Sequence, residues 1–466
     1  MIFCGKIAIE KRGLRQYSKR KNETGGAAMI FLNQAQEKRI KRANTDWWIN
    51  EKAMVGNNGL TYIAYVTDMG EVHVKELDAK CSKTPSRDVC ICRLNCNYSD
   101  EHNAPSLCVM ADGRIIVAYT GHAQTHALKY RITARPYDLL SFGPEHTLAY
   151  EKSVTYAQLF ENEKQGQLWL FTRVNSVTWE FRYSADAGES WSAPNKFLIS
   201  DAGGLFYFDT RKQYVATETG VAEQWVFALY GHPRISKDHT IRSGIFDADG
   251  WLLTMDGQRT NVNLYGEAEG QKTETLLTLT ELATVYEAPA GATVRLLEVA
   301  PTRPLRVGLA AFQMLKPDTI TYYAATWRNG KWHLSQPIAK AGAFLAPNQT
   351  DGSQTYVPGM AYYYGVGEEG LCWLHGGDSD TNRLFIAREE NGGWLLESYV
   401  SRDCGESYQL EQVIRHLPAG DGRKIWRPIV PIHAQDNLQV YWHEGTYSAH
   451  TGGWHCDTIM LVEYDD

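Results

Sequence analysis

The chain contains the segment SADAGESW at residues 184–191 and a matching segment, SRDCGESY, at residues 401–408. Both follow the form S-x-D-x-G-x-S-aromatic, and they begin 217 residues apart. That distance equals four units of roughly 50 residues, which is the length of a four-stranded blade in a β-propeller. The repeated segment therefore predicts a propeller fold.

The residue types of the repeated segment suit a hairpin turn. The aspartate carboxylate caps backbone N–H groups, the glycine adopts a positive φ, and the aromatic side chain packs inward. Such a turn is expected at the outer edge of a blade, away from any site near the propeller axis. We therefore assign Asp186 and Asp403 to structure and exclude them from catalysis.

Composition also favours an all-β fold. The 466 residues include 14 Trp, 26 Tyr and 40 Gly, and 43 % are hydrophobic. Such a chain is typical of a globular protein with many strands and turns. Short apolar runs, such as residues 61–66 and 168–173, alternate with Gly, Asn and Asp. Helical periodicity is almost absent, and its best candidates are residues 33–42 and 406–416.

These observations predict one domain, a seven-bladed β-propeller with four-stranded antiparallel blades, over residues 29–466. Residues 1–28 carry seven Lys and Arg with little to bury and are expected to form a disordered extension. A strand from residues 29–44 is expected to complete the last blade, because closure removes exposed sheet edges. The expected blades are residues 45–98, 99–150, 151–205, 206–270, 271–345, 346–418 and 419–466.

Charge and hydropathy limit the partners. The net charge is −7 and the chain has no basic block beyond its first 45 residues, which argues against nucleic acid. No apolar run approaches the roughly 18 residues of a membrane span, so we expect no membrane partner. The first residues lack the apolar core of a secretion signal, which predicts a cytoplasmic protein, or a secreted one if translation starts elsewhere. Nothing in the sequence sets an oligomeric state.

The nine cysteines are odd in number and scattered, which favours reduced thiols over a disulfide framework. Four of them, Cys81, Cys90, Cys92 and Cys96, cluster in the sequence and raise the question of zinc. Their spacing matches none of the common paired Cys-x-x-Cys patterns, so ordinary loop thiols are favoured. We assign no metal ligand and no required cofactor, and a structural calcium or zinc ion stays an open alternative.

The candidate site begins with residues 102–122, HNAPSLCVMADGRIIVAYTGH, in which two apolar runs are bracketed by His102 and His122. Asp112 and Gly113 between the runs are a strong hairpin signal. The start and the end of a hairpin lie at the same edge of a sheet, so the two histidines should lie close together. Two imidazoles at one edge are suited to proton transfer.

The next predicted blade contains a similar passage. Tyr156 opens it and Arg173 ends it seventeen residues later, compared with twenty residues between His102 and His122. Each residue alone has an ordinary explanation: a turn histidine, a packing tyrosine or a strand-end arginine. All four at equivalent edges of neighbouring blades favour one shared functional site.

Five short motifs lie at or near these strand ends: HNAP at 102–105, GH at 121–122, TYAQ at 155–158, FTR at 171–173 and GHP at 231–233. They resemble the motifs of the BNR (Asp-box) repeat-containing family of seven-bladed polysaccharide lyases, which includes ulvan lyases and rhamnose-glucuronate lyases. The likeness covers most of residues 45–466 and is strongest between residues 99 and 235. Ala157 stands where the family pattern has proline, and the absence of a secretion signal is a second departure.

The resemblance implies a lyase that cleaves a 4-linked uronic acid in an acidic glycan by β-elimination. Arg173 would neutralise the uronate carboxylate, since an arginine stays charged and can grip a carboxylate with two donors. Tyr156 and His122 would supply the base and the acid, in an order left open, and His102 would assist. The expected substrate-binding residues are Asn103, His232 and Arg234.

Two other functions stay open. A sialidase-like glycoside hydrolase fits the Asp-box repeats, but such enzymes share an Arg-Ile-Pro element that is absent from this sequence. A non-catalytic sugar-binding propeller is the third alternative. Its ligand face would carry aromatic and amide side chains without a matched acid and base.

Overall fold

The structure is a computed structural model, and residues 35–466 form one compact unit, to which all that follows refers. Residues 1–34, with the extension expected at 1–28, lie outside the described residues. Regular structure in the described ranges is β-strand apart from three short 3-10 helices, η2 (Glu101–Asn103), η3 (Leu139–Ser141) and η4 (Leu279–Glu281). The described residues are 36–45, 52–78, 86–94, 101–199, 206–217, 220–231, 236, 238–266, 276–302, 304–313, 316–341, 371–373, 382–434, 439–448 and 453–462.

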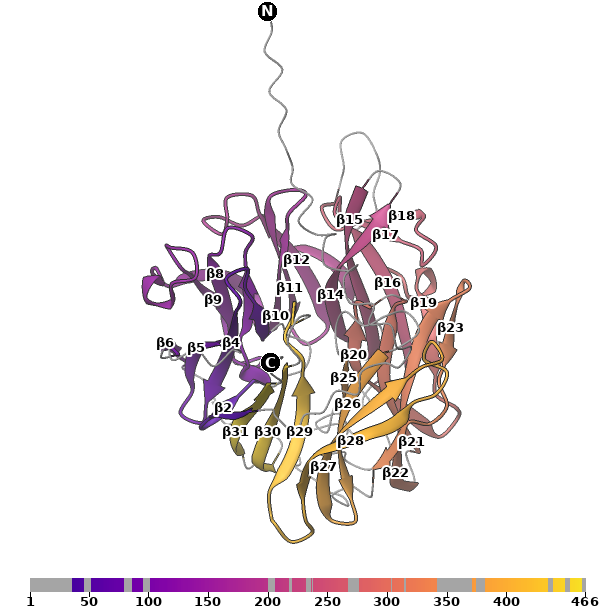
Figure 1. Cartoon of the computed structure of the whole chain (residues 1–466). Helices are drawn as coiled ribbons and strands as arrows, with labels where there is room; N and C mark the ends of the chain where they lie inside the picture. Colours follow the sequence, from indigo (N-terminus) through magenta and orange to yellow (C-terminus); the bar gives the residue numbers. More distant parts are fainter. Residues whose placement is uncertain are drawn as a thin grey trace, which may run out of the picture. The chain divides into compact units, whose positions relative to one another are not determined.

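The described strands form six antiparallel sheets, and Figure 1 shows them following one another in chain order. The first sheet contains β2 (Ala43–Asn44), β3 (Ala53–Val55), β4 (Leu60–Thr67), β5 (Glu71–Asp78) and β6 (Asp88–Arg93). The second contains β7 (Ser106–Val109), β8 (Ile115–Tyr119), β9 (Thr125–Ile132), β10 (His146–Asn162), β11 (Gln167–Val174), β12 (Thr178–Ser184) and β13 (Asn195–Ile199).

The third and fourth sheets follow in the middle of the chain. The third contains β14 (Phe206–Thr217), β15 (Gly220–Gly231), β16 (Thr240–Asp247), β17 (Trp251–Leu253), β18 (Arg259–Asn263) and β19 (Ala283–Glu287). The fourth contains β20 (Ala292–Ala300), β21 (Arg306–Gln313), β22 (Lys316–Arg328), β23 (Lys331–Leu334) and β24 (Ala339–Ala341).

The last two sheets have four strands each. The fifth contains β25 (Leu371–Trp373), β26 (Asn382–Glu390), β27 (Gly393–Ser401) and β28 (Gln409–Leu417). The sixth contains β29 (Lys424–Ile429), β30 (Gln439–Ser448), β31 (Gly453–Val462) and the N-terminal strand β1 (Gln36–Ile40). β1 pairs with β31, so strands from the two ends of this unit share one sheet. In Figure 1, β29 to β31 (yellow) lie beside β2 (indigo).

The fold is all-β with a propeller arrangement, but the prediction of seven separate four-stranded sheets is wrong for the described strands. There are six sheets, and only two of them have four strands. The difference arises at β10, which pairs with β9 from His146 to Ala149 and with β11 from Val154 to Asn162. One continuous strand therefore joins two four-stranded groups into a single seven-stranded sheet.

The two helix candidates are also wrong. Residues 33–42 contain strand β1, and residues 406–416 contain most of strand β28. β28 is an edge strand that pairs with β27, and its side chains are mostly exposed or half-buried. Edge strands are often rich in charged side chains. In the sequence, such a strand resembles the polar face of a surface helix.

A ring of hydrogen bonds joins the sheets through β3, β7, the second half of β10, β14, β20 and β25, here called the inner strands. In each step, a side chain on one inner strand accepts the backbone N–H of the next. The bonds are Val109 N to Met54 Sδ at 3.4 Å, Leu159 N to Ser106 Oγ at 3.3 Å, Thr210 N to Gln158 Oε1 at 2.9 Å, Val299 N to Asp209 Oδ2 at 3.1 Å and Trp373 N to Glu298 Oε2 at 2.7 Å.

Backbone bonds connect Ile432, which follows β29 of the sixth sheet, to strand β3 of the first sheet. Val55 N donates to Ile432 O at 2.8 Å, and Ile432 N donates to Ala53 O at 3.0 Å. The inner strands thus satisfy their N–H groups across sheet boundaries and, between β7 and β10, within the seven-stranded sheet, where no continuous backbone ladder is available.

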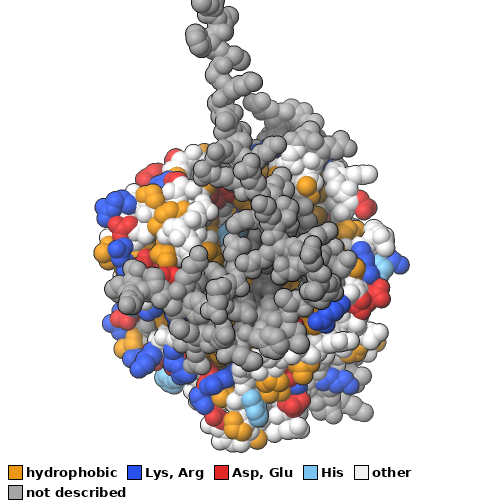
Figure 2. All heavy atoms as spheres, viewed as in Figure 1, with side chains coloured by type: hydrophobic (Ala, Val, Ile, Leu, Met, Phe, Trp, Pro, Cys, Tyr) orange, Lys and Arg blue, Asp and Glu red, His pale blue; other side chains and the backbone are white. Residues whose placement is uncertain are grey.

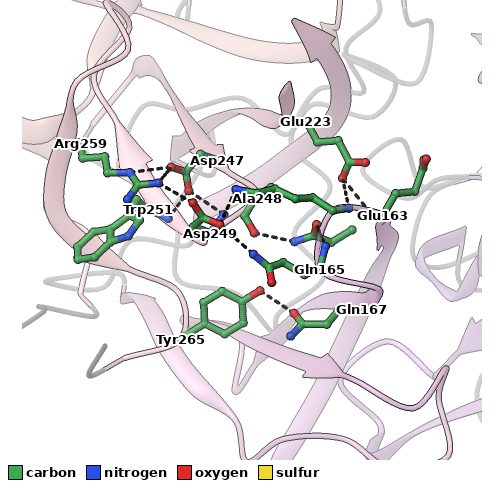
Figure 3. Close-up of polar contacts among 12 residues, drawn as sticks. Glu163, Gln165, Gln167, Glu223, Asp247, Ala248, Asp249, Trp251, Arg259 and Tyr265 are labelled. Carbon is green, nitrogen blue, oxygen red and sulfur yellow. Dashed lines mark hydrogen bonds and ion pairs between the residues drawn. The ribbon is translucent and has the colours of Figure 1, made fainter. Parts of the chain in front are cut away.

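Polar contacts reinforce the boundary between the second and third sheets (Figure 3). Asp249 accepts bonds from Lys164 Nζ at 2.7 Å and from Gln165 Nε2 at 2.8 Å. Arg259 bridges Asp247 and Asp249, with Nη2 at 2.8 Å and 2.7 Å from their carboxylate oxygens. The turn between β10 and β11 is therefore fixed against the third sheet.

The two repeated segments form the same turn. Asp186 Oδ1 accepts Ser190 N at 2.9 Å, Ser190 Oγ donates to Asp186 Oδ2 at 2.6 Å, and Gly188 has φ 94°. In the second copy, Asp403 accepts the corresponding bonds from Ser407 at 3.0 and 2.6 Å. The predicted capping by aspartate and the positive φ of glycine are confirmed.

Acid should weaken this turn. Hydrogen bonds from the Ser190 hydroxyl and N–H lower the pKa of Asp186 from 3.8 to about 2. A lowered folded-state pKa stabilises the fold above about pH 4, and this contribution is lost as the pH falls towards 2. Asp186→Asn should therefore unfold with a shallower pH dependence in that window, measured by urea denaturation. Glu189→Gln, in an exposed position of the same turn, should keep the wild-type slope, and an unchanged slope in Asp186→Asn would contradict the assignment.

The ring of inner strands predicts a large stability effect at Asp209. This carboxylate is fully buried, pairs with Arg211 and accepts Val299 N. Asp209→Ala removes one member of a buried ion pair and the acceptor of Val299 N, so the free energy of unfolding should fall by about 3–5 kcal/mol. Glu390→Ala, which removes a half-exposed partner while Arg388 keeps Glu397, should cost less than about 1 kcal/mol. Both free energies of unfolding are measured by denaturant unfolding. Equal losses in the two variants would show that Asp209 contributes no more to stability than the half-exposed Glu390.

Candidate active site

The hairpin of β7 and β8 places the two histidines. The strands pair antiparallel, and Gly113 in the turn between them has φ 84°, so the predicted Asp-Gly hairpin is confirmed. His102 lies in η2 before β7, and His122 follows β8. Their rings stack with centroids 4.1 Å apart and an interplanar angle of 16°.

Strands β10 and β11 add Tyr156 and Arg173 to the histidine pair. The Tyr156 ring centroid lies 6.0 Å from that of His102 and 6.2 Å from that of His122. Arg173 Cζ lies 4.6 Å from the Tyr156 ring centroid, within the range of a cation–π contact. His102, Tyr156 and Arg173 are buried and His122 is half-buried. The structure therefore brings together all four residues that the sequence singled out as catalytic.

Arg173 is the most informative member of this cluster. Its side chain is 3 % exposed, and its Nε and Nη1 atoms have no hydrogen-bond partner within the described part of the chain. A buried charged donor without a partner is costly, and native proteins rarely keep one without a reason. The geometry is therefore suited to an anion that supplies the missing acceptors.

Of the three predicted substrate-binding residues, the structure describes only Asn103. Asn103 is fully buried, and its Oδ1 accepts His122 N at 2.8 Å, so this side chain holds the His122 loop in place. Its expected contact with substrate stays a prediction. Thr155 Oγ1 accepts the next N–H, that of Ala123, at 2.9 Å. His232 and Arg234 lie outside the described residues.

Sequence reasoning missed a neighbouring group of tyrosines and arginines. Arg173 Cζ also lies 5.4 Å from the Tyr207 ring, which stacks on Tyr230 with centroids 5.3 Å apart. Arg295 Nε donates to the Tyr230 hydroxyl at 3.4 Å. Burial raises the pKa of Tyr230, and the charges of Arg295 and Arg427 oppose that shift. Tyr207 and Arg295 lie on inner strands β14 and β20, so alignment of inner strands was the signal that could have found them.

The described residues hold neither a cluster of metal ligands nor a disulfide. No group of three or more His, Cys, Asp or Glu in these ranges is arranged to hold a metal ion. The six cysteines that the structure describes are free thiols, whereas Cys81 and Cys96 lie outside its described ranges. None of the helices described in the structure has the length and apolar character required to cross a membrane.

The surface in Figure 2 shows acidic and basic side chains interspersed around the rim of this face. Opposite charges that alternate over short distances largely cancel beyond a Debye length of about 10 Å. The described side chains around the rim of this view therefore form no large patch of one sign.

Residues 60–253 match the model of a family described as "BNR repeat-containing family member". Two solved structures of an ulvan lyase, described as a new family of polysaccharide lyase, are similar to this chain. The first, bound to -[GlcA(1-4)Rha3S]-, has a TM-score of 0.64 and 12 % identity, and the alignment covers 91 % of this chain and 95 % of that one. The second has a TM-score of 0.63 with the same identity and coverage. At this identity the likeness shows the fold, an all-β propeller.

A third structure, AofleA from Arthrobotrys oligospora, has a TM-score of 0.38 and 8 % identity, covering 83 % of this chain and 90 % of that one. That score is too low to support an argument. No curated protein matches the chain.

Proposed function

We propose that the protein is a polysaccharide or oligosaccharide lyase that cleaves a 4-linked uronic acid by β-elimination and releases an unsaturated uronate. The observation that carries the proposal is the buried Arg173 guanidinium, with two nitrogen atoms unpartnered among the described residues, beside Tyr156 and the His102–His122 pair. The fold likeness to an ulvan lyase supports a propeller scaffold for this chemistry.

The reaction needs an anion site because of the acidity of the substrate. A base removes the proton at C5 of the uronate, the electron pair forms the C4–C5 double bond, and the C4–O4 bond breaks. Negative charge builds up on the adjacent carboxylate in the transition state. Arg173 is proposed to bind that carboxylate and stabilise the charge, which is the role of a preorganised donor in a water-poor site.

The remaining groups are proposed to move the protons. One group takes the C5 proton and another donates a proton to the departing O4, so atoms balance without water or an oxidant. Tyr156 and His122 are the candidates for base and acid, with the order open, and His102 is proposed to assist from its stacked position. Arg295 and Arg427 add positive charge near Tyr230, which would favour an acidic glycan over a neutral one.

Product chemistry separates this proposal from its alternatives. Purified protein should be incubated with a panel of uronate-containing glycans while ultraviolet absorbance and reducing ends are both followed. Only a lyase leaves a double bond that absorbs in the ultraviolet. Reducing ends without that absorbance would favour a sialidase-like hydrolase, and glycan binding without any product would favour a non-catalytic sugar-binding propeller.

Arg173→Lys tests the anion site. Lysine keeps the positive charge but loses the planar array of donors, so the rate should fall by two or more powers of ten. This loss corresponds to roughly 3–4 kcal/mol for one transition-state donor. The matched control is Arg182→Lys, because Arg182 Cζ also lies 4.6 Å from a tyrosine ring, that of Tyr150. Steady-state rates of the two variants decide the matter, and a similar rate in both would remove Arg173 from the mechanism.

Tyr156→Phe tests proton transfer. The ring remains and only the hydroxyl is lost, so turnover should disappear while glycan binding, measured by calorimetry, stays largely intact. Tyr150→Phe is the control, since the Tyr150 hydroxyl is buried and has no hydrogen-bond partner in the described ranges. If Tyr156→Phe forms the unsaturated product at near wild-type rate, the base and acid must instead be His122 and His102.

A further inference from the structure

Tyr156 has an unusual backbone conformation. Its φ is 63°, in the left-handed region that residues with a Cβ atom rarely adopt, and least of all large ones. Such a conformation persists only where surrounding contacts hold it, and it is common at functional sites. The contacts that hold Tyr156 therefore bear directly on the proposed site.

The cause of the conformation is a β-bulge. In the ladder between β10 and β11, Thr155 pairs with Arg173 and Gln158 pairs with Phe171. Two residues of β10, Tyr156 and Ala157, thus lie opposite the single residue Thr172. A bulge of this kind leaves backbone groups without ladder partners and re-aims a side chain.

Thr172 supplies the missing partner. Its side chain is fully buried, and its hydroxyl donates to Tyr156 O at 2.7 Å and, more weakly, to Thr155 O at 3.3 Å. On the other side of the bulge, Gln158 is bonded to Phe208 O at 2.8 Å and to Thr210 N. The bulge is therefore held from β11 on one side and from β14 on the other.

We propose that Thr172 is a positioning residue for the active site. Its hydroxyl stabilises the bulge, and the bulge directs the Tyr156 ring towards the two histidines and Arg173. The consequence for catalysis rests on the proposed function, whereas the consequence for the conformation of Tyr156 does not.

A packing role alone does not account for a threonine here. Valine has nearly the same shape, is a favoured strand residue and carries no polar atom into a fully buried position. The hydroxyl is useful only because it satisfies the carbonyl that the bulge exposes. A matched control lies on the neighbouring inner strand β14, where the Thr210 hydroxyl is buried without a hydrogen-bond partner among the residues described.

The test compares three variants of the full chain. Thr172→Val removes the hydroxyl and should lower kcat by about tenfold or more, with KM changed by less than about threefold, because a misplaced catalytic group slows the chemical step. Thr172→Ser keeps the hydroxyl and should retain kcat within about threefold. Thr210→Val makes the same replacement without losing a bond and should behave like wild type. Should Thr172→Val not fold, Thr172→Ala replaces it in the comparison with Thr172→Ser.

Crystal structures of the Thr172 variants give a readout that does not depend on activity. In Thr172→Val we expect Tyr156 to leave the left-handed region and its ring to move away from Arg173, while Thr172→Ser keeps both. The proposal is overturned if Tyr156 keeps its positive φ in Thr172→Val, if that variant keeps the wild-type kcat, or if Thr172→Ser loses as much as Thr172→Val. If the wild-type protein turns over no glycan, the proposed function fails, and the two structures alone decide the role of Thr172.

Discussion

The structure depends on hydrogen bonds between its inner strands, most of which cross from one sheet to the next. A buried N–H that faces a neighbouring sheet cannot join a continuous ladder, and leaving it unpaired is costly. Here a side chain from the preceding strand accepts it: a serine at 106, a glutamine at 158, an aspartate at 209 and a glutamate at 298. These bonds fix the positions of neighbouring inner strands relative to one another. The strand ends that carry functional side chains are then fixed relative to one another as well.

The candidate site is supported by the same kind of hydrogen bond between inner strands. Gln158 belongs both to the ring of inner strands and to the bulge, because it binds β14 immediately after the bulged pair on β10. The bonds of Thr155 and Asn103 extend this support to the loop that carries His122. Tyr156 thus lies on strand β10, and the loop that carries His122 is hydrogen-bonded to that strand and to η2. Proton transfer requires groups that are held in fixed positions in this way.

Local patterns were readable in the sequence, and long-range pairing was not. The aspartate turns, the Asp-Gly hairpin and the two histidines follow from residue types over short spacings, and Tyr156 and Arg173 follow from matched positions on the next blade. The ring residues recur at intervals of about 50 residues from Ser106 to Asp209, but their side chains differ, so no sequence repeat reveals them. The continuity of β10 and the edge position of β28 depend on partners far away in the chain, and this is why the sheet count and the helix candidates were wrong.

The environment of Arg173 links binding to catalysis. Its guanidinium lies within cation–π range of both Tyr156 and Tyr207, and these contacts use the faces of the rings and leave the nitrogen donors available. Nε and Nη1 are the donors without partners among the described residues. An anion that binds them would lie close to Tyr156, since Arg173 Cζ is 4.6 Å from the centroid of that ring. Recognition of a carboxylate and delivery of its neighbouring C–H to a titratable hydroxyl would then follow from one arrangement, so a change that moves Tyr156 should affect the rate more than the affinity.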